Sequence, residues 1–184
     1  MFTLTIDDSL ALQLLEERHA APLFDLIDAS REHLGRWLAW VDTTRSPDDC
    51  RAFIRAGLQQ FAAGKGVQAG IFANGQLAGV IGHRKLDFTH RKNELGFWLG
   101  ASFVGRGIAT RALHAMLRYA FVELDLNRST IRCPAGHARA RALAERCGFV
   151  LEGTIRRTNW LHDRYVDHAL YGLLRDEWEA DRVS

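Results

Sequence analysis

The sequence is poor in proline, cysteine and long apolar runs. Three prolines against 16 glycines exclude collagen-like and proline-rich disordered chains. Cys50, Cys133 and Cys147 form no close pair, so we expect no disulfide framework, and the thiols fit a reducing compartment. No apolar stretch approaches the roughly 18 residues that a membrane helix needs, and the N-terminus lacks a signal-peptide pattern. We therefore expect a cytoplasmic protein without a membrane partner.

Lysine is also scarce, and neither sign of charge dominates. Three lysines stand against 21 arginines, and the formal net charge is only +2. No run of five like charges occurs, so we expect no nucleic-acid partner, although 21 arginines keep a nucleic-acid-binding protein open as an alternative. The histidines lack metal-ligand spacing, so we expect no metal site.

The remaining composition is that of an ordinary globular chain. Of 184 residues, 47% are hydrophobic, 25% charged and 10% aromatic. This length fits one domain over residues 1–184. A domain of this size removes roughly 70% of its unfolded surface from water, so it needs neither disulfides nor metals to stay folded.

Apolar periodicity alternates between helical and strand spacing along the chain, which predicts a mixed α/β fold of the α+β class. The clearest hairpin is centred on Asn74-Gly75, because this pair favours a tight turn between strands. Gly96 lies inside a predicted strand and marks a candidate β-bulge. The predicted helices cover 17–36, 46–63, 107–124 and 137–147, and the predicted strands cover two runs within 2–15 and then 67–73, 76–87, 92–100, 128–133, 149–160 and 164–174.

The sharpest chemical signal is the turn from Val104 to Thr110, which follows a strand and opens a helix. Gly105 and Gly107 let the backbone approach a ligand closely, and the free N–H groups of the first helical turn face it with the positive end of the helix dipole. This geometry suits a pyrophosphate. A P-loop would need Gly-Lys-Ser/Thr, which is absent, and a dinucleotide fingerprint would need Gly or Ala at Thr110. The alternative is a tight turn that binds nothing.

The turn is one of several motifs that together span nearly the whole chain. Asn93-Glu94-Leu95-Gly96-Phe97-Trp98-Leu99 precedes Phe103-Val104-Gly105-Arg106-Gly107-Ile108-Ala109-Thr110. Further motifs are His33-Leu34-Gly35-Arg36-Trp37-Leu38, Ala144-Glu145-Arg146-Cys147-Gly148-Phe149 and Arg175-Asp176-Glu177-Trp178. Taken in their order along the chain, these motifs resemble those of the GNAT superfamily of acetyl-CoA-dependent N-acetyltransferases, in its RimJ/RimL branch.

The resemblance implies a central, mostly antiparallel twisted sheet with a splayed parallel strand pair, flanked by about four helices. The splayed strands would be 93–99 and 129–133, with Gly96 helping to open them. Their free N–H and C=O groups would bind the pantetheine amides of acetyl-CoA as another strand would. The cofactor contacts that the resemblance implies are Phe97, Trp98, Leu99, His137 and the turn residues Val104, Gly105, Arg106, Gly107, Ile108, Ala109 and Thr110.

Two positions depart from the branch pattern. His137 and Ala140 stand where relatives carry Asn and Ser. That Ser is proposed to protonate the departing thiolate, which Ala140 cannot do. His137 is a candidate to donate the proton, and Tyr165 is a second candidate. The alternatives are a histidine that only begins a helix and a tyrosine that is buried in a hairpin.

Glu94 is the candidate general base, acting directly or through a water molecule. The alternative is an ordinary strand glutamate in an ion pair. Asn159 stands where other relatives carry a glutamate base, and an amide cannot serve. An α-amine asks little of a base, because neutralising it at pH 7 costs about 1 kcal/mol, against about 4.6 kcal/mol for a lysine amine.

Trp37, Trp40 and Trp160 are candidate walls of an acceptor groove, although core packing explains most aromatic residues. The leading interpretation is direct transfer of acetyl from acetyl-CoA to an amine, the N-terminal α-amine of a protein such as a ribosomal protein. A small amine or antibiotic acceptor remains an alternative, as does a non-catalytic acyl-CoA-binding module, which His137 and Ala140 motivate. The resemblance also suggests a homodimer.

Overall fold

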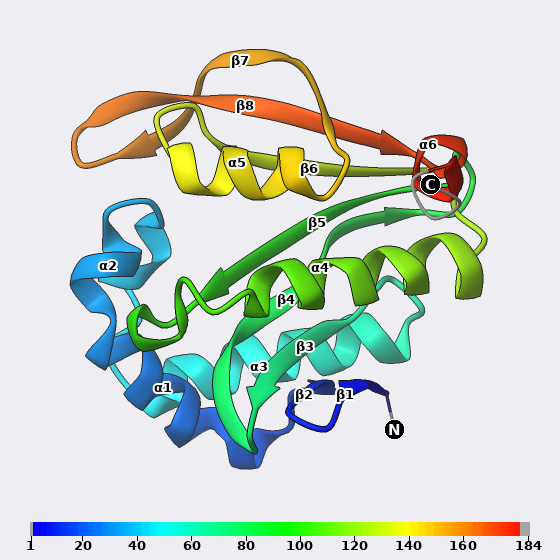
Figure 1. Cartoon of the computed structure of the whole chain (residues 1–184). Coiled ribbons are helices and arrows are strands. Elements are labelled where there is room, and N and C mark those ends of the chain that lie inside the picture. The colour runs from blue at the N-terminus through cyan, green and yellow to red at the C-terminus, as the bar shows by residue number, and fades with distance from the viewer. Residues whose placement is uncertain (1, 181–184) are drawn as a thin grey trace.

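One eight-stranded sheet carries helices on both faces in the computed structural model, which describes residues 2–180 (Figure 1). The strand order is β1-β2-β3-β4-β5-β6-β8-β7, and every neighbouring pair is antiparallel except β5 and β6. The strands are β1 (Thr3–Asp7), β2 (Leu10–Leu14), β3 (Gln68–Ala73), β4 (Gln76–Asp87), β5 (Lys92–Leu99), β6 (Arg128–Pro134), β7 (Val150–Leu161) and β8 (Arg164–Leu174). The predicted mixed fold and its parallel pair are confirmed.

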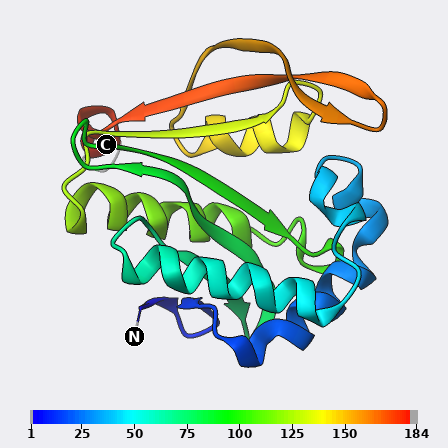
Figure 2. The same ribbon diagram turned by 180° about the vertical axis from the view of Figure 1, so that it is seen from behind.

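The helices divide between the two faces of the sheet. Helices α1 and α3 cover one face, and α4 and α5 lie on the other (Figures 1 and 2). The α-helices are α1 (Ala20–Ala29), α2 (Arg31–Gly35), α3 (Pro47–Ala62), α4 (Ile108–Arg118), α5 (Ala138–Arg146) and α6 (Arg175–Ala180). Residues 2–180 thus hold six α-helices rather than about four, because one predicted helix is divided and α6 was not predicted.

Local sequence chemistry accounts for the best-predicted elements. The hydroxyl of Ser46 accepts a hydrogen bond from the Asp49 N–H at the start of α3, and the Asp49 carboxylate accepts one from the Ser46 N–H at 2.9 Å. The β3–β4 hairpin turns on Asn74 and Gly75, whose φ angles of 49° and 76° fit a type I′ turn. Both predictions are confirmed.

The predicted helix over 17–36 is wrong at one point, because the chain breaks at Ser30 between α1 and α2. Ser30 has φ −115° and ψ 11° and is 4% exposed. Its hydroxyl accepts a hydrogen bond from the Ala101 N–H at 3.0 Å. Periodicity continues through this serine, but the polar contact ends the helix and fixes the α1–α2 junction against the end of β5.

The predicted bulge at Gly96 is also displaced. Gly96 pairs regularly with Gly82, and the register shift lies in β4 between His83 and Lys85. The extra residue is therefore Arg84, whose side chain crosses Gly96: a Cβ built on Gly96 would lie 2.9 Å from Cδ of Arg84. The glycine is needed for this close approach rather than for a bulge of its own.

Two clusters of buried apolar residues lie on opposite faces of the sheet. The first joins the sheet to α4 and α5 and includes Leu113, Met116 and Trp178. The second joins α1 and α3 to the sheet through Leu23, Ile54 and their neighbours. No helix within residues 2–180 is both long enough and apolar enough to cross a membrane.

Candidate active site

Strands β5 and β6 separate at the centre of the sheet. Their parallel pairing runs from Lys92–Arg128 to Leu95–Ile131 and ends there. Beyond it, the facing edges of residues 96–99 and 132–134 have no strand partner in the described chain, and the ribbons diverge (Figure 1). A cavity of about 760 Å³ lies at this opening and is lined by residues of both strands.

The turn before α4 lines the same cavity. Gly105 and Gly107 have φ angles of 81° and 70°, a region that only glycine adopts without strain. Gly107 is the N-cap of α4 and offers no side-chain acceptor, so the first N–H groups of the helix are left for a ligand. The predicted cofactor residues that line the cavity here are Val104, Gly105, Gly107, Ile108, Ala109 and Thr110.

Arg106 differs from the rest of the turn. Its guanidinium lies over the Phe103 ring, 5.8 Å from the ring centroid, and lines a separate small cavity of about 160 Å³. On the strand side, Phe97, Trp98 and Leu99, for which the resemblance implies cofactor contacts, all line the main cavity. The structure thus brings together every predicted cofactor residue except Arg106.

An open parallel pair facing an uncapped glycine turn is the arrangement expected of an acetyltransferase, and comparison with known proteins agrees. Residues 9–150 match the acetyltransferase (GNAT) domain family. The chain belongs to the GNAT acetyltransferase family. This GNAT protein is 36% identical over 183 residues to YdaF of Bacillus subtilis (strain 168), covering 99% of this chain and 100% of that one.

Two further relatives place the GNAT chain among N-acetyltransferases. It is 30% identical over 174 residues to the ribosomal-protein-serine acetyltransferase of Escherichia coli (strain K12), covering 95% of this chain and 97% of the relative. The microcin C7 self-immunity acetyltransferase MccE, solved with acetyl-CoA and AMP, superposes with a TM-score of 0.87 at 26% identity, over 92% of this chain and 94% of that one. The protein is therefore an N-acetyltransferase.

His137 precedes α5 at the edge of the cavity and stacks on Trp37. The two ring centroids are 4.3 Å apart and the planes differ by 13°. Burial, His33 and Arg139 together lower the pKa of His137. The ring is therefore mostly neutral at pH 7, which suits it to hydrogen bonding and stacking better than to releasing a proton.

Glu94 is buried on β5 and does not line the cavity. Its carboxylate accepts two hydrogen bonds from the Arg132 guanidinium, one of them from Nε at 3.0 Å. Nε of Arg84 lies 3.6 Å from the other carboxylate oxygen. An amine in the cavity can therefore pass a proton to Glu94 only through a water molecule or after a movement of an arginine.

The remaining candidates lie outside the cavity. Trp40 packs on Trp98 with ring centroids 5.7 Å apart, and it is 37% exposed and does not line the cavity. Trp160 and Tyr165 pair edge-to-face at the end of the β7–β8 hairpin, where they are 55% and 61% exposed. Tyr165 is thus not the buried tyrosine of the alternative interpretation. Of the three predicted acceptor-wall tryptophans, only Trp37 lines the cavity.

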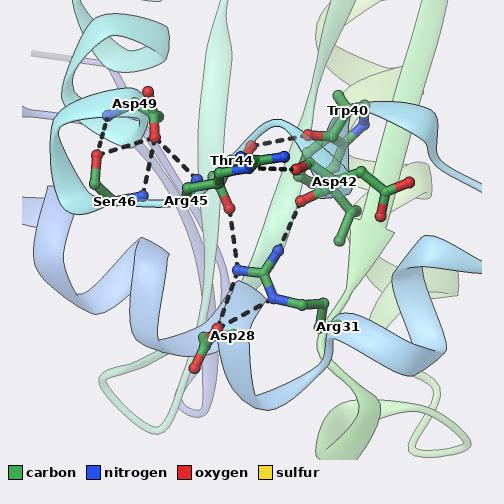
Figure 3. A network of polar contacts seen from close by, with 9 residues as sticks. Asp28, Arg31, Trp40, Asp42, Thr44, Arg45, Ser46 and Asp49 are labelled. Atoms are coloured by element: carbon green, nitrogen blue, oxygen red, sulfur yellow. Dashed lines mark hydrogen bonds and ion pairs between the residues drawn. The ribbon is translucent and has the colours of Figure 1, made fainter.

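A polar network fixes the loop around Trp40 (Figure 3). From α2, the Arg31 guanidinium donates to the carbonyls of Val41 at 2.7 Å and Thr44 at 3.0 Å, and also to Asp28. These bonds close the loop after α2 onto α1. The loop is therefore held by hydrogen bonds from α2 and by the packing of Trp40 on Trp98 of β5.

Four arginines of the cavity were not singled out from the sequence, because they occur in no run. They come from three elements, β4, β6 and α5, and meet only in the folded chain. Within residues 2–180, the cavity lining contains the thiol of Cys133 and six residues with basic side chains: His33, Arg84, Arg132, His137, Arg139 and Arg146. No Asp or Glu among these residues lines the cavity, so the charged side chains of its lining, called the basic lining below, are all positive.

Proposed function

We propose that the protein transfers acetyl from acetyl-CoA to the N-terminal α-amine of a protein, of the ribosomal-protein type. The observation that carries this proposal is the cavity where β5 and β6 part, faced by the uncapped turn of α4. The similarity to a ribosomal-protein-serine acetyltransferase along almost the whole of both chains supports the acceptor class.

The residues present fit acetyl-CoA as cosubstrate. The unpaired edges of residues 96–99 and 132–134 offer the alternating donors and acceptors that pantetheine amides need. The N–H groups from Ile108 to Thr110 would hold the pyrophosphate, assisted by the helix dipole. In this arrangement the thioester lies near Leu95 and Ile131, where the strands begin to part.

The reaction we propose is a direct attack in a ternary complex. The neutral amine forms a bond to the thioester carbonyl carbon, the C–S bond breaks, and the amine proton leaves to solvent or a base. A thiolate is a tolerable leaving group because its conjugate acid has a pKa near 8.5. Ala140 offers no proton to it, and the basic lining stabilises the thiolate instead.

The experiment incubates the protein with acetyl-CoA and a panel of N-terminal peptides, polyamines and aminoglycosides. Released thiol and product mass are measured together, and peptides with a blocked α-amine and an internal lysine serve as control. We expect acetyl only on free peptide α-amines. Acetylation of a polyamine or an aminoglycoside would show that the acceptor is a small amine rather than a protein. Tight binding of acetyl-CoA without thiol release would favour a non-catalytic acyl-CoA-binding module.

The wider setting of the protein is also part of this proposal. All three cysteines are buried and unpaired, which supports a reducing, cytoplasmic environment. The one sheet that joins the strands from β1 to β8 supports a single domain. Strand β7 is a long edge strand on which Val150 and Leu151 are 55% and 44% exposed. An exposed apolar edge of this kind supports the proposal of a homodimer.

A further inference from the structure

Arg84 and Arg132 stand on either side of β5 and share a single carboxylate. Arg84 comes from the bulge of β4 and Arg132 from β6, and between them lies Glu94. Two guanidiniums facing one carboxylate leave one positive charge uncompensated. Within residues 2–180, neither arginine has a second acidic partner, and both line the cavity.

Both guanidiniums also keep unused hydrogen-bond donors. A guanidinium has five N–H donors. Arg132 uses Nε and one terminal nitrogen on Glu94, and Arg84 approaches Glu94 only through Nε, at 3.6 Å. The side chain of Arg84 is 60% exposed. The remaining N–H groups are free to bind an anion, and planar guanidiniums favour a carboxylate.

These donors belong to a different side of the sheet from the cofactor turn. Strand residues alternate between faces, and Leu95 and Ile131 pack toward α4. Glu94 and Arg132, their neighbours in sequence, therefore project from the opposite face, where Arg84 crosses Gly96. An acetyl donor held at the α4 turn would leave this face to the acceptor.

The buried His168 lies in the electrostatic field of Arg84, Arg132 and Glu94. It is 8% exposed, and its Nε2 has no hydrogen-bond partner among the described residues. Burial, Arg84 and Arg132 lower its pKa, and Glu94 only partly offsets them. An acceptor amine in the same field would also lose its proton more easily, whereas a polycation would be repelled.

We propose that Arg84 and Arg132 form a carboxylate-binding subsite, so that the enzyme prefers α-amines with an acidic residue directly after them and rejects polyamines. This inference rests on the proposed function and narrows its acceptor class. The acidic side chain would bind the free guanidinium donors, and the neighbouring α-amine would then lie at the opening between β5 and β6.

The test compares three short amidated peptides that begin Ser-Glu, Ser-Gln and Ser-Lys and are otherwise identical, with spermidine as a polyamine. We expect kcat/KM to fall about tenfold from Glu to Gln, as one charge-assisted hydrogen bond implies, and further to Lys. Spermidine should be acetylated most slowly. Equal rates on the three peptides would overturn the subsite while leaving the proposed function standing.

Variants locate the preference. Arg84→Gln is the variant of choice, because this exposed side chain makes only one long ion pair and its loss should not prevent folding. We expect it to bring the Glu-to-Gln ratio close to one, and Arg84→Lys to keep part of the preference. Arg118→Gln, on the surface of α4, should keep the native ratio. An unchanged ratio in Arg84→Gln would overturn the assignment.

A binding measurement separates the two proposals. Binding of the same peptides to the CoA-loaded protein is followed by the fluorescence of the cavity tryptophans. If no peptide is acetylated but Ser-Glu still binds more tightly than Ser-Gln, and Arg84→Gln abolishes the difference, the transfer function fails and the subsite stands. If no peptide shows a preference in binding or turnover, the subsite fails.

Discussion

At the scale of the residue, Glu94 is both the candidate general base and the carboxylate between Arg84 and Arg132. Its carboxylate is held by Arg132 and faces Arg84, and it does not line the cavity. The residue can serve the reaction as a base through a water molecule, or by holding the two arginines. These roles differ in what a neutral isostere removes, because glutamine still accepts a hydrogen bond but cannot take a proton.

We predict that Glu94→Gln lowers kcat about a hundredfold while the affinity for acetyl-CoA stays within a factor of two, because a general base contributes 10²–10⁴-fold. Steady-state kinetics and a CoA titration measure the two quantities. Glu152→Gln is the matched control, since Glu152 also binds an arginine, Arg128, but lies outside the cavity. Unchanged turnover would remove Glu94 from the mechanism, and a loss confined to acidic acceptors would assign it to the arginine pair.

At the scale of the element, the turn before α4 is proposed to bind the cofactor through its backbone N–H groups rather than through side chains. Gly105 lines the cavity with φ 81°, and a Cβ built there meets nothing within 4 Å. Gly75 in the β3–β4 hairpin has φ 76° and the same open surroundings, but it does not line the cavity. Both glycines therefore have a positive φ angle, but only Gly105 borders the cavity.

We predict that Gly105→Ala and Gly75→Ala each lower the free energy of unfolding by about 1 kcal/mol, because alanine is strained at positive φ. Only Gly105→Ala should weaken acetyl-CoA binding, by about tenfold, since its methyl group stands where the pyrophosphate approaches the backbone. Urea unfolding and a binding titration measure both quantities. Equal acetyl-CoA affinity in the two variants would contradict the role of the turn.

The same scale shows which features the sequence could predict. The α3 cap at Ser46 and the hairpin at Asn74-Gly75 were predictable because their determinants lie within a few residues. The break at Ser30 was not, because its hydroxyl is bound by Ala101, 71 residues away. The basic lining could not be predicted for the same reason, because Arg84, Arg132 and Arg146 come together only when the sheet and α5 fold. The exposure of Tyr165 was not predictable either, because a strand pattern does not say which end of a hairpin is exposed.

At the scale of the molecule, the two halves of the sheet are joined across the opening as well as through β5 and β6. The Trp37–His137 stack connects the loop after α2 to α5. Nε2 of His162, in the β7–β8 turn, lies 2.9 Å from the Gly35 carbonyl. In Figure 1, α2 lies opposite the β7–β8 turn, at the end of the sheet where the ribbons of β5 and β6 diverge. Contacts from both halves of the sheet therefore maintain the cavity, and we expect it to be lost when the domain unfolds.

His83 makes that stability sensitive to acid. It lies in β4 with no exposed surface, its Nδ1 accepts a hydrogen bond from the Val67 N–H at 3.2 Å, and burial lowers its pKa to about 4. The unfolded chain takes a proton below pH 6.5, whereas the folded chain does not until about pH 4. Stability from the neutral ring is thus fully present above pH 6.5 and is lost as the pH falls toward 4.

We predict that the free energy of unfolding falls about 3 kcal/mol more between pH 7 and pH 4 in the native protein than in His83→Leu, as 2.5 pH units between the two pKa values imply. The variant should start lower at pH 7, because the Val67 N–H loses its acceptor. Urea unfolding at several pH values measures the slope, and His162→Gln, which alters an exposed histidine bonded to the Gly35 carbonyl rather than to a carboxylate, should keep the native slope. Carboxylates with lowered pKa values, such as that of Glu152, add acid sensitivity to all three proteins equally, so the difference isolates the buried ring. Parallel slopes in the native protein and His83→Leu would mean that folding does not lower the pKa of His83.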